Sequence, residues 1–115
     1  MTFHKVASVT EIPTGCARAV VVGGEPVAVV HLASGEVKAI HNICSHLYYE
    51  LAPEGPIADN TIECALHGSI FDLDTGAAMT LPAIDPIPVY PCEVVDGDVL
   101  VDVERQRNDA RPPRH

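Results

Sequence analysis

Short Val-rich apolar runs, separated by Gly, Pro and Asp, recur along the chain and are typical of an all-β domain. Ala17–Val22, the turn Gly23–Pro26 and Val27–His31 predict a hairpin. Ser34-Gly35 then separates this hairpin from Glu36–Ile40, so we expect three successive antiparallel strands. No window of a dozen residues has a helical period free of Pro or Gly, so any helix spans only a turn or two.

The end of the chain repeats the hairpin pattern. Tyr90–Val95 and Asp98–Val103 flank the dipeptide Asp96-Gly97, which is a strong turn signal between apolar runs. We expect Phe3–Ala7 to pair with one of these terminal strands. Residues 104–115 are polar and contain Pro, with little to bury, and they predict a disordered tail.

Composition limits the chain to one small domain. Its 115 residues are 47% hydrophobic but include no Trp, two Phe and three Tyr, so the core is mostly aliphatic. The formal net charge is −9, and residues 1–103 carry three basic and fourteen acidic side chains. Such a field repels phosphate backbones and anionic lipids, which argues against nucleic acid and membrane partners and favours a basic protein partner.

We expect a cytoplasmic location. No stretch approaches the roughly 18 apolar residues of a membrane span, and Met1–Thr10 lacks the apolar segment of a secretion signal. Because the cytosol keeps thiols reduced, the four cysteines are expected to be metal ligands or plain thiols. Cys16 and Cys92 have no partner at ligand spacing and are expected to be plain thiols.

Two Cys/His pairs lie between the two β regions. Cys44 and His46 form a C-x-H pair, and after seventeen residues Cys64 and His67 form a C-x₂-H pair. Zinc is one alternative, because Cys₂His₂ is a structural zinc set. The C-x-H spacing is tighter than the usual zinc turn, and a chain of this size does not need zinc to fold. The pattern is that of a Rieske centre, in which two Cys hold one iron of a [2Fe–2S] cluster and two His hold the other.

The resemblance extends beyond these four residues. Ile62–Gly76 reads IECALHGSIFDLDTG and is followed by Leu81-Pro82-Ala83 and Asp96-Gly97-Asp98-Val99. In these features the chain resembles the soluble Rieske ferredoxins of bacterial aromatic-ring dioxygenases, over most of residues 3–103. The resemblance implies a Rieske [2Fe–2S] domain over residues 1–103. Its fold would be an antiparallel β-sandwich or barrel-like core with a cluster-binding subdomain inserted at about residues 41–83.

The resemblance also implies roles for individual residues. Cys44 and Cys64 would bind the inner iron of one [2Fe–2S] cluster, and His46 and His67 the outer, solvent-facing iron. Pro82 would belong to a proline loop that covers the cluster. Leu47, Leu66 and Ser69 would complete the cluster environment.

Departures from high-potential Rieske proteins indicate a potential toward the low end. Those proteins join two further cysteines in a disulfide, at positions that here hold Tyr49 and Leu66. They also donate hydroxyl hydrogen bonds to the cluster from a Ser and a Tyr, which here correspond to Ser69 and Phe71. Only the Ser is retained.

By this resemblance the protein is no enzyme but an electron carrier. It would take single electrons from an NAD(P)H-dependent, flavin-containing ferredoxin reductase and pass them to a terminal Rieske non-haem iron oxygenase that dihydroxylates aromatic compounds. The chain has no nicotinamide or flavin motif of its own. Two alternatives stay open: an accessory Rieske ferredoxin of iron–sulfur assembly or another redox pathway, and a domain like the nitrite reductase small subunit.

Overall fold

A computed structural model describes residues 3–46 and 48–112, and within these ranges it contains ten β-strands in three antiparallel sheets. One short 3₁₀ helix, η1 at Val9–Glu11, follows the first strand. The strands are β1 (His4–Ser8), β2 (Cys16–Val22), β3 (Glu25–His31), β4 (Val37–His41), β5 (Ile57–Ala58), β6 (Thr61–Glu63), β7 (Ile70–Asp72), β8 (Val89–Tyr90), β9 (Cys92–Val95) and β10 (Asp98–Val101). The predicted all-β class is confirmed, and no helix in the described ranges could cross a membrane.

The predicted three-strand meander is confirmed as β2–β3–β4. Cys16 pairs with His31 and Val22 with Glu25 across the first hairpin, and His31 pairs with Val37 across the second. Gly23 and Gly24 form the first turn with φ of +55° and +82°. Glycine is the residue that reaches this backbone region without a steric cost, so the turn forms where the sequence predicts it.

The predicted strand Tyr90–Val95 is wrong as a single element. Pro91 divides it into β8, which pairs with β4 through Tyr90 and Ala39, and β9, which pairs with β10 through Val95 and Asp98. Proline has no N–H to donate to a ladder, so the chain leaves one sheet and enters the next at this residue. As predicted, the first strand pairs with a terminal one, because β1 lies against β10.

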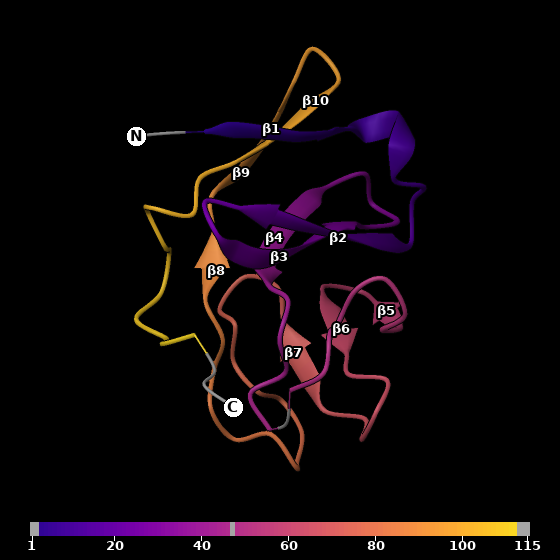
Figure 1. Ribbon diagram of the computed structural model, residues 1–115. Helices are drawn as coiled ribbons and strands as arrows, with labels where there is room; N and C mark the ends of the chain where they lie inside the picture. Colours follow the sequence, from indigo (N-terminus) through magenta and orange to yellow (C-terminus); the bar gives the residue numbers. More distant parts are fainter. Residues whose placement is uncertain (1–2, 47, 113–115) are drawn as a thin grey trace.

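The three sheets stack as layers, with β2–β3–β4–β8 in the middle (Figure 1). Alternate residues of β3 point to opposite faces. Val27 and Val29 join an apolar cluster with Val99 and Val101 of β10, whereas Ala28 and Val30 join a second cluster. A strand buried on both faces reads as a continuous apolar run, which explains the unbroken stretch from Val27 to Val30.

The third sheet, β5–β6–β7, is inserted in the sequence between β4 and β8. It lies below the middle layer in Figure 1, with a loop on either side of it in sequence. Ile62 of β6 and Phe71 of β7 are fully buried in the second apolar cluster, against Ile40 of β4. This packing fixes the inserted sheet, and the loops around it, on the middle layer.

Part of the segment predicted as a disordered tail is hydrogen-bonded to the rest of the chain. Arg107 N donates to Val89 O at 2.7 Å, and the side chain of Asn108 bonds to backbone atoms of Thr75, Ile87 and Val89. Because these are side-chain and backbone hydrogen bonds, a shortage of apolar residues in the segment does not prevent its ordering.

Candidate metal centre

Two loops carry the predicted ligands, and both close with the same backbone hydrogen bond. Cys44 N donates to Tyr49 O at 3.0 Å, and Cys64 N donates to Ser69 O at 2.7 Å, so each amide reaches the carbonyl five residues further on. In the second loop Gly68, with φ of +80°, also donates to Cys64 O. We name residues 44–49 and 64–69 the first and second ligand loops.

The cysteines of the two loops are buried and the histidines are not. Cys44 and Cys64 are each 2% exposed and belong to one apolar cluster with Leu51, Phe71 and Ala83. His46 is half-buried and His67 is exposed. The arrangement therefore places sulfur donors toward the protein interior and imidazoles toward solvent.

The two imidazoles face each other through the same ring atom. His46 Nδ1 and His67 Nδ1 lie 3.3 Å apart, and the ring centroids are 5.2 Å apart with planes tilted by 60°. Two nitrogens bound to one tetrahedral metal ion at about 2.0–2.1 Å lie about 3.3–3.4 Å apart. The imidazoles are thus spaced as neighbouring ligands of a single metal ion.

The donors fit a two-iron cluster, because each iron of a Rieske centre takes only two protein ligands, two thiolates or two imidazoles. A structural zinc ion needs all four donors around one centre. Within residues 3–46 and 48–112, no three His, Cys, Asp or Glu side chains gather closely enough to hold one ion. Two buried cysteines and two imidazoles with Nδ1 atoms 3.3 Å apart are the donors that a Rieske [2Fe–2S] cluster takes, and the residues present fit that group.

The remaining cysteines are consistent with plain thiols, and the four described cysteines form no disulfide. Cys16 is exposed near the start of β2. Cys92 is the first residue of β9. Burial is the main cause that raises the pKa of its thiol to about 12, and the nearby Glu93 carboxylate adds to it. A thiol with that pKa stays protonated at neutral pH and is a poor metal ligand.

Residues 81–89, named here the cover segment, contact both ligand loops. Ala83 N donates to Ser69 Oγ at 3.1 Å, and Ser45 Oγ donates to Asp85 O at 2.6 Å. Pro82 is half-buried in this segment and follows a cis peptide bond. Among the other predicted environment residues, Ser69 is fully buried, Leu66 is 44% exposed, and Leu47 lies outside the described residues.

Sequence reasoning missed two polar side chains that shape the loops. Asn42, just before the first ligand loop, accepts from Ala52 N at 2.7 Å through Oδ1 and from Leu51 N at 2.8 Å through its backbone oxygen. Thr80 Oγ1 accepts from Ile70 N and donates to Gly68 O. These bonds join residues nine to twelve positions apart, and no local spacing signals them.

His41 is a buried histidine outside the ligand set. Its Nδ1 lies 3.3 Å from the Tyr90 hydroxyl and 4.0 Å from a Glu25 carboxylate oxygen. Burial lowers the pKa of His41 to about 4, because the charged imidazolium would lose its hydration there. Burial also raises the pKa of Tyr90. His41 is thus a neutral core residue at physiological pH.

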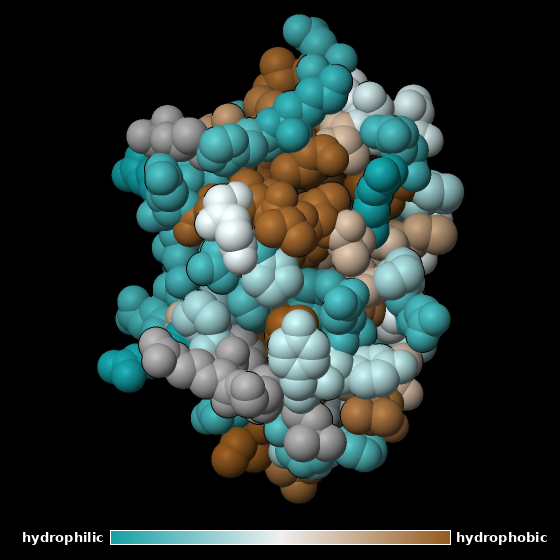
Figure 2. Space-filling model, in the orientation of Figure 1, coloured by the Kyte–Doolittle hydropathy of each residue, from teal (hydrophilic) through white to brown (hydrophobic). Residues whose placement is uncertain are grey.

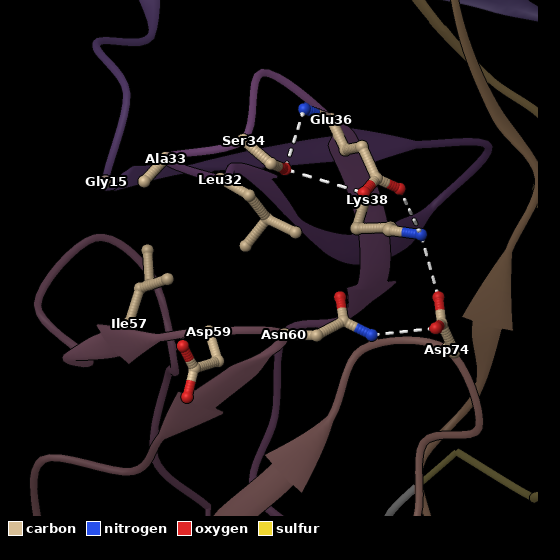
Figure 3. A pocket seen from close by; sticks show the side chains of 10 residues that line it. All are labelled: Gly15, Leu32, Ala33, Ser34, Glu36, Lys38, Ile57, Asp59, Asn60 and Asp74. Carbon is tan, nitrogen blue, oxygen red and sulfur yellow. Dashed lines mark hydrogen bonds and ion pairs between the residues drawn. The ribbon is translucent and has the colours of Figure 1, made fainter.

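Two of the cavities lie away from the ligands. One of about 410 Å³ lies between the middle sheet and the inserted sheet, where Lys38 Nζ bonds to Asp74 at 2.8 Å and to Glu36 at 3.2 Å, and Asn60 Nδ2 donates to Asp74 (Figure 3). A hollow of about 300 Å³ lies between β1 and β2 and exposes apolar surface (Figure 2). Neither is lined by Cys44, His46, Cys64 or His67.

Comparison with known proteins agrees with this geometry. The family model of the Rieske [2Fe-2S] domain matches residues 2–91. The chain is 37% identical over 101 residues to the anthranilate 1,2-dioxygenase ferredoxin subunit of Burkholderia cepacia, covering 88% of this chain and 92% of that subunit.

Two solved structures share the fold over nearly the whole chain. The ferredoxin of carbazole 1,9a-dioxygenase from Nocardioides aromaticivorans IC177 has a TM-score of 0.82 and 32% identity, covering 99% of this chain and all of that one. The ferredoxin in a complex with the oxygenase of carbazole 1,9a-dioxygenase has a TM-score of 0.78 and 29% identity, covering 98% of this chain and 96% of that one. With two buried cysteines and two facing imidazoles on its ligand loops, and with this likeness along its length, the chain belongs to the Rieske [2Fe-2S] domain family.

Proposed function

We propose that the protein is the ferredoxin of a multicomponent aromatic-ring dioxygenase. It carries single electrons from an NAD(P)H-dependent flavin reductase to a terminal Rieske non-haem iron oxygenase, and it turns over no substrate itself. The observation that carries the proposal is the His46–His67 pair, whose Nδ1 atoms lie 3.3 Å apart on the two loops that also carry the buried Cys44 and Cys64. Two relatives similar along most of the chain are the anthranilate 1,2-dioxygenase ferredoxin subunit and the ferredoxin of carbazole 1,9a-dioxygenase.

In this proposal Cys44 and Cys64 would hold the inner iron of the cluster, and His46 and His67 would hold the outer iron. A bound Rieske cluster supplies a site that accepts and releases one electron. The apolar cluster around the cysteines keeps water from the thiolate side. The half-buried His46 and the exposed His67 offer a short path to a docked partner.

The surface beside the imidazoles suits brief docking. Exposed apolar side chains lie on the ligand loops and on residues 79–84, which are tied to those loops; they are Tyr48, Leu66, Met79, Leu81 and Ile84. Glu54 is exposed and lines a hollow with Tyr48 beside the first ligand loop. An apolar patch with an acidic rim favours weak, quickly released complexes with basic surfaces.

The reductase and the oxygenase are inferred as partners from this surface and from the relatives. One solved relative is a ferredoxin in a complex with its oxygenase. The relatives are named for anthranilate and for carbazole, which are different aromatic compounds. We infer that the oxygenase selects the aromatic substrate. The cytoplasm, with its NAD(P)H and reduced thiols, is the proposed location.

The first test is electron paramagnetic resonance of the dithionite-reduced protein, together with iron and zinc analysis. We expect about two irons per chain and a rhombic signal whose average g value lies below that of the free electron. His67→Ala and Cys64→Ser are expected to abolish the signal, whereas His31→Ala and Cys16→Ser, outside the loops, are expected to keep it. One zinc per chain without a signal would overturn the proposal.

The second test concerns the partners. A purified dioxygenase reductase with NADH is expected to reduce the protein, and the reduced protein is then expected to support turnover by the matching oxygenase. Reduction without any support of oxygenase turnover would instead indicate a ferredoxin of another redox pathway.

A further inference from the structure

The segment after β10 runs beside β8 and down toward the inserted sheet (Figure 1). We propose that Asn108, in this segment, is a positioning residue for the metal centre. It fixes the far end of the cover segment, Ile87–Val89. Through that segment it sets how closely the two ligand loops are covered. The inference rests on the proposed function, since it concerns the same centre.

One side-chain amide joins two separate stretches of backbone. Asn108 Oδ1 accepts from Val89 N at 3.1 Å, and Asn108 Nδ2 donates to Ile87 O at 2.8 Å and to Thr75 O at 2.8 Å. The first two bonds hold the end of the cover segment, and the third holds the turn after β7. The arrangement needs one acceptor and two donors, which an amide supplies and a carboxylate does not.

Neighbouring groups hold this amide in place. Gln106 Nε2 donates to Asn108 Oδ1 at 3.0 Å and to Asn108 O at 2.8 Å, and it also donates to Ala110 O. Arg107 N donates to Val89 O at 2.7 Å. Asn108 is therefore held at a fixed position by its own segment.

The turn after β7 is built to receive the amide. Gly76 has φ of +74°, and a Cβ there would lie 2.7 Å from Asn108 Nδ2 and 2.0 Å from Ile87 O. Ile87 N in turn donates to Gly76 O at 2.9 Å. Only a glycine lets the turn, the cover segment and the amide approach this closely.

The cover segment carries the effect to the ligand loops. Its near end is tied to Ser69, two residues after His67, and to Ser45, between Cys44 and His46. Its far end is tied to Asn108 and Gly76. With Asn108 removed, the far end loses its side-chain partners, but β8 keeps its pairing with β4. We therefore expect the cover to loosen while the fold persists.

The test compares Asn108→Ala and Asn108→Asp with the wild-type holoprotein. Readouts are the rate of cluster loss to a chelator, the midpoint potential, and hydrogen exchange of the Val89 amide. We expect both variants to lose the cluster roughly tenfold faster, as for a buried hydrogen-bond group left unpaired. The midpoint potential is expected to shift, and the Val89 amide to exchange faster.

Two controls separate positioning from general stability. Asp109→Ala changes an exposed neighbour and is expected to behave as wild type. Val99→Ala opens space in the opposite apolar cluster, and it is expected to lower the melting temperature without moving the midpoint potential. The inference would be overturned if Asn108→Ala had the same midpoint potential and the same rate of cluster loss as the wild type. It would also be overturned if Val99→Ala shifted the midpoint potential as much as Asn108→Ala.

The exchange measurement also distinguishes this inference from the proposed function. If the wild-type protein held zinc instead of a cluster, the proposed function would fail, and cluster loss and potential would have no meaning. Faster exchange of Val89 in Asn108→Ala would then still support the contact. Unchanged exchange would overturn the positioning role in either case.

Discussion

The amide nitrogen of Ala83 donates a 3.1 Å hydrogen bond to the hydroxyl oxygen of Ser69, and Ser69 is fully buried. Because Ser69 Oγ accepts this bond, the hydroxyl hydrogen remains to be donated elsewhere. Ser45, on the other ligand loop, uses its hydroxyl hydrogen on Asp85 O. The two serines near the ligands are therefore not equivalent donors.

Ser69→Ala is expected to lower the midpoint potential by on the order of 50 mV, the equivalent of one hydrogen bond lost from the more negative reduced state. Ser45→Ala is the matched control, because the hydroxyl of Ser45 is already committed to Asp85, and its shift is expected to be smaller. Film voltammetry measures both. An unchanged midpoint in Ser69→Ala would show that its hydroxyl points away from the cluster.

Gly76→Ala is expected to destabilise the protein much more than Gly24→Ala. Both glycines have positive φ, at +74° and +82°, so both substitutions carry a backbone cost of about 1–2 kcal/mol. At Gly24 the added Cβ meets nothing within 4 Å, whereas at Gly76 it meets Ile87 O at 2.0 Å. Thermal melts of both variants measure the difference. Equal melting temperatures would mean that the close approach at Gly76 is easily relieved.

His41 is expected to make stability depend on pH. Its pKa of about 4 in the fold lies below the ordinary 6.5, so the unfolded chain binds a proton more readily between these values. The stabilisation linked to the neutral state of His41 is complete above pH 6.5. As the pH drops from there toward 4, the free energy of unfolding decreases by on the order of 3 kcal/mol in all. Attraction between an imidazolium and Glu25, 4.0 Å away, opposes part of this loss.

Melting temperatures at pH 7.5 and pH 5 test this expectation. The melting temperature is expected to fall less between pH 7.5 and pH 5 in His41→Asn than in the wild type. Because the two proteins differ at this one residue, the comparison isolates His41. His4→Asn on the exposed edge of β1 serves as control and is expected to show the wild-type fall. Identical falls in all three proteins would contradict the buried neutral state.

Electron transfer from the reductase is expected to slow as salt is added. The acidic surface attracts basic partners over long range, and a rate fall of roughly tenfold between about 50 and 500 mM NaCl is typical of such steering. Stopped-flow reduction at limiting protein measures it. Glu54→Gln, near the first ligand loop, is expected to slow the low-salt rate, and Glu93→Gln on β9 is not. Flat rates across the salt range would exclude steering.

The sequence predicted the parts of the fold that are local. The β2–β3–β4 meander and the β9–β10 hairpin follow from apolar runs and from Gly- and Asp-containing turns, which act over a few residues. The division at Pro91 was missed because both halves continue the apolar pattern. Strands β5, β6 and β7 have two or three residues each, too few for an alternation to be visible.

The candidate ligands were predictable because metal chemistry demands particular residue types at close spacing. Their surroundings were not. Asn108 contacts residues 19, 21 and 33 positions away, in a segment whose composition alone indicates disorder. Its partners are backbone atoms, which carry no residue-specific signal. Only the folded chain shows why an asparagine is needed at this position.

The position of Asn108 in the sequence has a consequence for synthesis. Translation proceeds from the N-terminus, so both ligand loops and the cover segment are synthesised before Asn108. Until then the far end of the cover segment has no side-chain amide to hold it. The contact that holds the far end of the cover segment therefore forms only after both ligand loops have been made.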